Sequence, residues 1–180
     1  MDIEIDAEAK DKRLNRLVAL TVVVLSIFMG LSQVKDGNIV QGMAQAQSNA
    51  VDRWGEYQAT RTKLHIDETA LAQARVTPGL AAEASRLTAE IAKYDRETPA
   101  LRKQAEGFQS QYDALNVHDD QFDASDAAIG VAVAIAAVAA LSESFPALFV
   151  AWAFGGFGMI MGLAGFFGWA IKSPLASLLS

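Results

Sequence analysis

Residues 17–31 read Leu-Val-Ala-Leu-Thr-Val-Val-Val-Leu-Ser-Ile-Phe-Met-Gly-Leu, and this uncharged apolar run decides the fold class. Extended to residues 14–34, it spans about 21 residues, or roughly 31 Å of helix, which matches the hydrocarbon core of a bilayer. A secretory signal peptide is the alternative, because basic residues precede the run. Acidic residues in the same leader, and a small-x-small site only at residues 44–46, favour a retained membrane span.

A second apolar block occupies the C-terminal third of the chain and is too long for one crossing. Ser142-Glu-Ser-Phe-Pro146 interrupts it with a charge and a helix-breaking proline. We therefore predict two further spans, at residues 125–141 and 147–171. The remaining ends are an N-terminal tail at residues 1–13 and a C-terminal tail at residues 172–180.

Small residues recur along both C-terminal spans at helical spacing. Lipid provides no hydrophobic drive for helix association, so close backbone approach at small residues has to supply the packing energy. The alternative is that glycine and alanine are simply common in membrane helices. We predict helix packing through one face of the third span and one of the second: Gly158, Gly162, Ala164 and Gly168, with Ala128, Ala132, Ala136 and Ala140.

The polar middle, residues 35–124, shows a heptad pattern on both sides of Thr77-Pro78-Gly79. Proline and glycine are typical of a turn, so the pattern predicts two antiparallel helices with a coiled-coil seam. With the turn at 77–79, Leu71 should lie near Ala84 and Leu87, Leu64 near Ile91, and Trp54 near Leu101 and Arg102. Pro99 should kink the pair. The predicted seam is Trp54, Tyr57, Leu64, Leu71, Leu87, Ile91, Tyr94, Leu101, Phe108 and Tyr112.

The predicted fold class is therefore an all-α membrane protein with three transmembrane helices and a long antiparallel helical hairpin between the first and second. The 180 residues carry a net charge of −6 and no cysteine. An acidic chain without a basic stripe is a poor nucleic-acid binder. Without cysteine there are no disulfides or thiolate metal sites.

His118, Asp119 and Asp123, just before the second span, are the candidate metal ligands. The alternative is that these residues mark the membrane surface and that Asp123 or Asp126 caps the second span. Consecutive helical side chains point in different directions, which favours the alternative, so we predict no metal site and no cofactor. Trp54 and Arg102 are placed for a structural cation–π contact.

The predicted spans lack charged residues between positions 17 and 34, 127 and 141, and 147 and 171. Pumps and transporters nearly always need one there, and the chain also lacks nucleotide-binding, nucleophile-elbow and HExxH motifs. We therefore predict that the protein is not an enzyme. Basic residues before the first span place the N-terminus in the cytoplasm and the hairpin outside it.

The segment Asn38-Ile-Val-Gln-Gly-Met-Ala-Gln-Ala-Gln-Ser-Asn-Ala-Val-Asp-Arg-Trp-Gly-Glu-Tyr-Gln-Ala59 resembles the Ala-Gln, Asp-x-Trp and Tyr-Gln-Ala pattern of the bacterial domain-of-unknown-function family 4337. Residues 118–123 and an apolar hairpin ending Gly-Leu-Ala-Gly-Phe-Phe167 are similar to its C-terminal half. Family members often carry basic residues between the last two spans, and this chain does not. The resemblance implies the architecture and a bacterial inner-membrane location, and transfers no catalytic residue.

Two functional hypotheses follow. The first is a structural or accessory membrane protein that forms homo-oligomers or docks onto a larger membrane complex through its small-residue faces and its hairpin. The second is an oligomeric channel or small-molecule conduit, motivated by the glycine-rich uncharged spans.

Overall fold

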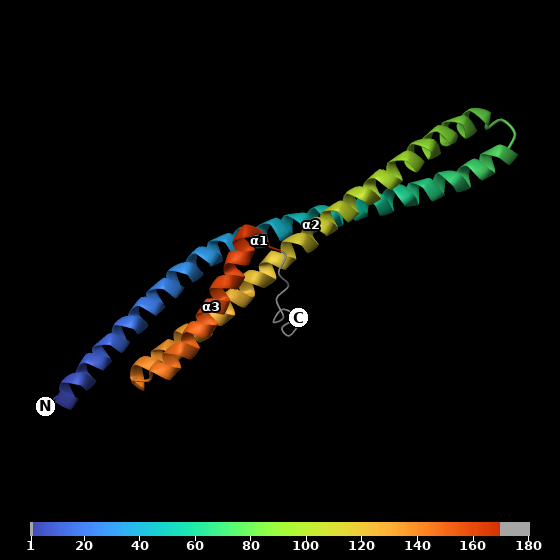
Figure 1. The fold of residues 1–180 in the computed structure, drawn as a ribbon. Helices are drawn as coiled ribbons and strands as arrows, with labels where there is room; N and C mark the ends of the chain where they lie inside the picture. The colour runs from blue at the N-terminus through green and yellow to red at the C-terminus, as the bar shows by residue number, and fades with distance from the viewer. Residues whose placement is uncertain (1, 170–180) are drawn as a thin grey trace. The chain divides into compact units, whose positions relative to one another are not determined.

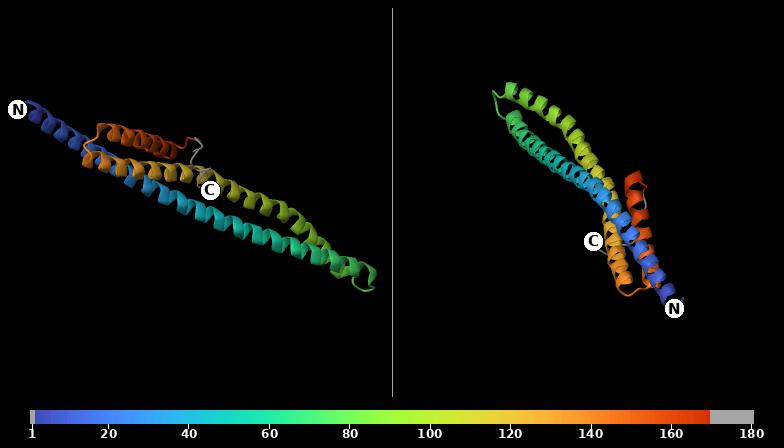
Figure 2. Two further views of the ribbon diagram at one scale, coloured as in Figure 1. Left: turned by 90° about the horizontal axis from the view of Figure 1, so that it is seen from below. Right: turned by 90° about the vertical axis from the view of Figure 1, so that its left-hand side faces the viewer.

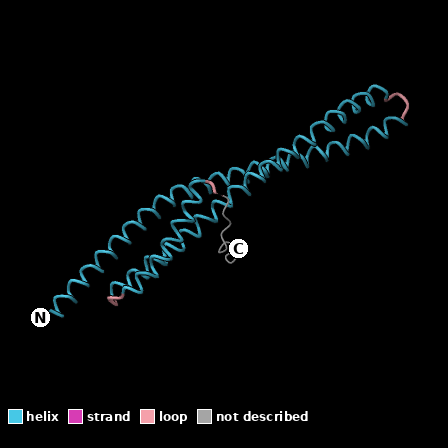
Figure 3. The backbone as a smooth tube through the Cα atoms, in the orientation of Figure 1, coloured by secondary structure: helices cyan, strands magenta, loops and turns pink. Residues whose placement is uncertain are grey.

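Three helices account for nearly all of the described chain. A computed structural model describes residues 2–169, with side chains from residue 12 onward. Helix α1 is Asp2–Val76, α2 is Ala81–Leu141 and α3 is Phe145–Phe167 (Figure 1). No strand occurs within residues 2–169, and short loops join consecutive helices (Figure 3). The prediction of an all-α chain is confirmed.

The two connections follow from local sequence chemistry. Gly79 has a φ of 87°, a left-handed conformation that costs glycine little, and the Thr77 hydroxyl donates to the Gln73 carbonyl at 2.9 Å. Before α3, the Ser144 hydroxyl accepts a hydrogen bond from the Ala147 amide at 3.4 Å, as an N-cap does. A proline within the first turn of α3 suits a position whose amide has no helical partner.

Helices α1 and α2 run past the predicted membrane spans, since a span can be one part of a longer helix. The backbone is helical from Asp2, so the predicted tail at residues 1–13 is part of α1. Helix α2 is continuous from Ala81 to Leu141, so the amides near residue 125 have helical partners and the predicted cap by Asp123 or Asp126 is wrong. Helix α3 ends at Phe167, because Gly168 adopts a left-handed φ of 69° and its amide bonds to the Ala164 carbonyl. Residues 170–180, with the predicted C-terminal tail, lie outside the described part.

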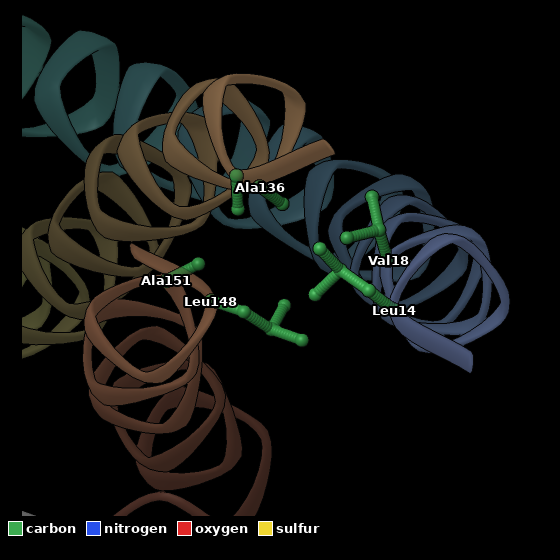
Figure 4. Packing of buried hydrophobic residues seen from close by; sticks show 6 residues of the cluster. Leu14, Val18, Ala136, Leu148 and Ala151 are labelled. Carbon is green, nitrogen blue, oxygen red and sulfur yellow. The ribbon is translucent and has the colours of Figure 1, made fainter. Parts of the chain in front are cut away.

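The chain forms two compact units, and both α1 and α2 contribute to each. The first unit comprises residues up to 41 together with those from 115 onward, and the second comprises residues 42–114. In the first unit, α3 packs beside α2 and α1 (Figure 2). Figure 4 shows one of its cores, in which Leu14, Val18 and Leu148 point toward the alanines of α2 and α3.

The second unit has a smaller apolar core near the turn. Leu71 and Ala74 of α1 are buried together with Leu87 of α2, and Ala84 and Ile91 pack against them. The predicted proximity of Leu71 to Ala84 and Leu87 agrees with this cluster.

Each of the three helices contains a stretch long and apolar enough to cross a membrane. In α1 only 17% of that stretch is buried within the protein. Large apolar side chains such as Leu20, Ile27 and Leu31 are more than half exposed. So much contiguous apolar surface is typical of a helix whose surroundings are lipid or another helix.

Candidate functional site

The predicted alanine face of α2 lies against glycines of α3. Ala128, Ala132 and Ala136 are buried, and Ala140 is half-buried. A Cβ atom added to Gly158 would lie 2.7 Å from Ile129 Cγ1 and 2.9 Å from the Ser125 carbonyl oxygen, so α2 and α3 touch through their backbones. Such approach is possible only where a helix has no side chain.

Further along α3, small residues make room for aromatic rings. A Cβ atom on Gly162 would meet the Phe28 ring of α1 at 2.6 Å, and one on Gly165 would meet the Phe122 ring of α2 at 2.8 Å. The rings of Phe122 and Phe166 pack edge to face with centroids 5.4 Å apart. All three helices therefore meet at this level.

The small residues of α3 differ in what surrounds them. Ala164 is fully buried, whereas Gly168 has nothing within 4 Å of an added Cβ among the described residues and instead ends α3. Gly155, which the pattern does not single out, packs closely: its added Cβ would lie 2.9 Å from Leu25 Cδ1. The neighbour that fills this space comes from α1, and the spacing of residues within α3 carries no information about it.

A group of polar side chains connects α1, α2 and the residue that follows the end of α3. Gln33 Nε2 of α1 donates to Asp126 Oδ2 of α2 at 3.1 Å. One turn farther along α1, the Asp36 carboxyl lies close to the Asp119 carboxyl of α2. Gln121 is fully buried, and its Nε2 donates to the Trp169 carbonyl at 2.7 Å. Polar contacts thus tie α2 to α1 and to the end of α3.

Two half-buried carboxyl groups among these side chains have raised pKa values. Burial, followed by the charges of Asp119 and Asp123, raises the pKa of Asp36 to about 6. Burial and the charge of Asp123 also raise the pKa of Asp119, although the hydrogen bond from Asp36 opposes this. Both shifts have the direction expected when carboxyl groups are partly buried and lie close to one another.

The candidate metal ligands do not converge. His118 Nδ1 lies 3.2 Å from Gln121 Oε1, whereas Asp119 lies close to Asp36. Within residues 12–169 no three histidine or carboxylate side chains are arranged to hold a metal ion. His118 and Asp119 thus point in different directions, as consecutive residues of a helix do, and Asp123 is exposed.

The predicted seam residues of the second unit are buried or half-buried. Leu64, Leu71 and Leu87 are buried. The half-buried ones are Trp54, Tyr57, Ile91, Tyr94, Leu101, Phe108 and Tyr112. The rings of Trp54 and Tyr57 pack edge to face with centroids 5.4 Å apart, and Arg102 Nε donates to Glu106 Oε1 at 2.7 Å.

An open pocket lies between α1 and α2, and its α2 wall comes from the residues on either side of Pro99. It measures about 450 Å³, and its walls come from residues 53–63 of α1 and 97–104 of α2. Pro99 lies inside α2 without ending it. The lining mixes Arg53 and Lys63 with Glu56 and Glu97, which leaves no net charge to select an ionic ligand.

These observations define an all-helical chain with three helices long and apolar enough to cross a membrane. A family model, the domain of unknown function DUF4337, matches residues 14–168, and the chain belongs to this family. Searches of curated proteins and of solved structures return no match.

Proposed function

We propose that this protein is a structural or accessory integral membrane protein, which self-assembles or docks onto a larger membrane complex. In this proposal α1, α2 and α3 each cross the bilayer, with the N-terminus in the cytoplasm. Residues 35–124 form an antiparallel coiled-coil hairpin outside it, at a bacterial inner membrane.

One observation supports the proposal: α2 and α3 form an apolar groove that no other described part of the chain fills. An apolar groove of about 520 Å³ opens between α2 and α3, lined by Ala127, Ala128, Val131, Ala153, Phe154 and Phe157. Gly130 and Gly156 lie on the same two helices, and no described side chain comes within 4 Å of a Cβ added to either. A floor of small residues with aromatic walls suits a partner helix.

Two levels of contact support the antiparallel hairpin. Near the turn, Leu71 and Ala74 meet Leu87. Farther from the turn, residues 53–63 and 97–104 line one cavity. The two segments at each level are about equally distant from Pro78, which is the register of an antiparallel pair. Double cysteine variants test it: Leu64→Cys with Ile91→Cys should form a disulfide, and Leu64→Cys with Phe108→Cys should not.

Membrane insertion is tested by extraction at alkaline pH, which strips peripheral proteins from vesicles. We expect the full chain to stay in the membrane pellet. Release into the supernatant would contradict the proposal. Because the chain has no cysteine, single cysteine variants at Glu8, before the first span, and at Val76, beside the turn, can then report sidedness. In intact cells, the proposed topology predicts that an impermeant maleimide labels residue 76 and does not label the N-terminal cysteine.

Assembly is tested by native mass spectrometry of the chain released from mild detergent. Gly130→Leu and Gly156→Leu each place a large side chain where an added Cβ meets no described atom, on the two helices that line the groove, so each should shift the mass from oligomer to monomer. Val138→Leu, an exchange at an exposed apolar position of α2, should leave the mass unchanged. A wild-type monomer that co-purifies with no partner would argue against the proposal.

The rival function, an oligomeric conduit, also rests on uncharged spans. Ion and small-molecule flux across reconstituted vesicles distinguishes it from the structural role. Flux that Gly156→Leu abolishes would favour the conduit.

A further inference from the structure

The outward face of α1 carries a ridge of large aliphatic side chains. Its members recur at intervals of four, three and four residues and are between 52% and 61% exposed: Leu20, Val24, Ile27 and Leu31. This heptad spacing keeps the side chains on one face of a helix and suits packing into a neighbouring helical surface. In the same unit, the groove of about 520 Å³ between α2 and α3 has small residues at its floor. The ridge and the groove are therefore complementary in shape.

We propose that the groove takes the α1 ridge of a second copy of this chain, so that copies assemble head to tail in the membrane. The inference rests on the self-assembly proposed above and identifies the surfaces that perform it. The position of the ridge and the groove, their depth and the charges at their ends all support this contact.

The ridge and the groove lie on opposite sides of the first unit. Leu25 of α1 packs against Gly155 of α3 and Ile129 of α2, so α1 covers one side of the α2–α3 pair (Figure 4). Four of the six groove residues stand two positions from these contacts: Ala127, Val131, Ala153 and Phe157. Two positions are about 200° around a helix, so the groove opens on the side away from α1. The ridge is exposed and points the other way.

This arrangement sets the symmetry of the assembly. A copy cannot fill its own groove from the opposite side of the unit. When the ridge of one copy enters the groove of another, the second copy's ridge points away from the first. A closed pair therefore cannot satisfy both grooves, and the contact is heterologous, which gives a ring or a row of more than two copies.

The ridge and the groove also lie at the same depth of the unit. Gln33 of α1 bonds to Asp126 of α2, and Leu25, nearer the N-terminus, clusters with Ala132. In this register the middle of the ridge is level with Val131 in the groove. Copies that share one orientation in a bilayer can make contact only between surfaces of equal depth, and the ridge and the groove meet this condition.

The charges at the two ends of each surface are opposite in sign. Arg16 and Lys35 are exposed and each stands one helical turn beyond the ridge on the same face of α1. Asp123 is exposed one turn before the groove on α2, and Glu143 is exposed in the loop before α3. By the same register Lys35 is about level with Asp123, and Arg16 with the loop. A basic residue of one copy therefore faces an acidic residue of the next at both ends, which favours this partner and this register.

Cross-linking between two differently tagged copies tests the contact. One copy carries Ile27→Cys on the ridge and the other carries Val131→Cys in the groove, and the chain has no other cysteine. Co-expressed in one membrane, the mixed pair should form a disulfide between subunits, and neither variant should form one alone. Val138→Cys is the matched control, because it is exposed on the same helix about 10 Å beyond Val131 and should not link to Ile27→Cys.

Charge reversal gives a readout that does not depend on disulfide formation. Lys35→Glu should weaken assembly by up to about fivefold, measured by energy transfer between labelled copies on dilution in detergent. Each contact joins Lys35 of one copy to Asp123 of the next, so Lys35→Glu with Asp123→Lys in every copy should restore assembly. Lys103→Glu makes the same change at an exposed position of the second unit and should leave assembly unchanged.

The outcomes separate this contact from the proposed function. A homo-oligomer whose mixed pair does not link, or in which Ile27→Cys links to itself, would overturn the contact and leave self-assembly standing. A closed dimer in native mass spectrometry would do the same. A chain that co-purifies only with a different membrane protein would overturn the contact and support the accessory role. A monomer without any partner would overturn both.

Discussion

The substitution Gly158→Ala tests whether α2 and α3 meet through their backbones. The added methyl carbon would lie 2.7 Å from Ile129 Cγ1, 2.9 Å from the Ser125 carbonyl oxygen and 3.2 Å from the Ile129 amide nitrogen. The side chain of Ile129 can rotate, but two of these three atoms belong to the backbone of α2. Helix α3 must therefore move away from α2.

The cost follows from what this movement loosens. Leu148, Ala151 and Met161 of α3 are all at most 3% exposed, and each loses dispersion contacts when the helices separate. Overpacking a tight interface costs about 1–3 kcal/mol. Alanine recovers up to about 1 kcal/mol through its better helix propensity. We therefore expect a net loss of about 1–2 kcal/mol in the free energy of unfolding.

Gly156→Ala is the matched control, because it makes the same chemical change two residues away. None of the described atoms lies within 4 Å of the methyl group it adds. At this position the substitution changes only the helix propensity, so the free energy of unfolding should stay equal or rise by up to about 1 kcal/mol. The two variants should differ by about 2 kcal/mol, or roughly 30-fold in the unfolding equilibrium.

The assay is reversible unfolding in mixed micelles of a mild detergent and dodecyl sulfate, followed by circular dichroism. It is run at high detergent excess, so that assembly does not contribute to stability. Equal free energies of unfolding for the two variants would refute the backbone contact. If Gly156→Ala is less stable than the wild type, the surface at Gly156 packs within the chain, and its assignment to a partner is refuted.

Three further predictions concern other parts of the molecule. The folded-state pKa of Asp36, about 6, lies above its ordinary 3.8, so the folded state binds this proton more tightly. The contribution of Asp36 to the free energy of unfolding is therefore full below the ordinary pKa and is lost as pH rises to about 6. Solvent screening limits it to about 1 kcal/mol, and Asp36→Asn should remove this slope from unfolding measured across the range. The Trp152 indole donates to the Thr21 hydroxyl at 2.8 Å between α3 and α1, so Trp152→Phe should cost about 0.6–1.7 kcal/mol in the same micelle assay. Leu87 is 3% exposed in the core of the second unit, and Leu87→Ala should lower the free energy of unfolding by about 2–4 kcal/mol. Ile66→Ala, at a 61% exposed position, should change it by less than about 0.5 kcal/mol in chemical denaturation.

The helices could be predicted from the sequence because their determinants are local. The turn at Pro78 and Gly79 and the break at Ser142–Pro146 depend on the backbone preferences of the residues within them. The proximity of Leu71 to Ala84 and Leu87 was also predictable, since a heptad pattern and a fixed turn together set the register.

The predicted caps of the second span were wrong because the same local pattern occurs in two different structural settings. Acidic residues before an apolar run are typical of a helix start, yet they occur equally inside a long helix that passes from polar to apolar surroundings. Helix α2 has helical residues before Asp123 that already supply partners for the amides there. A cap can be assigned only when the chain before it is known to leave the helix.

What the sequence alone determined is which stretches are helical and which are apolar enough for a membrane, because both are properties of consecutive residues. Only the tertiary structure decided which small residues touch a neighbour. Gly155 and Gly165 meet side chains from α1 and α2, whereas Gly168 ends α3. It alone placed Asp119 near enough to Asp36 to raise the pKa of Asp36, since their proximity depends on how α1 packs against α2. Packing between helices joins residues distant in the chain, and no spacing within one helix encodes its partner.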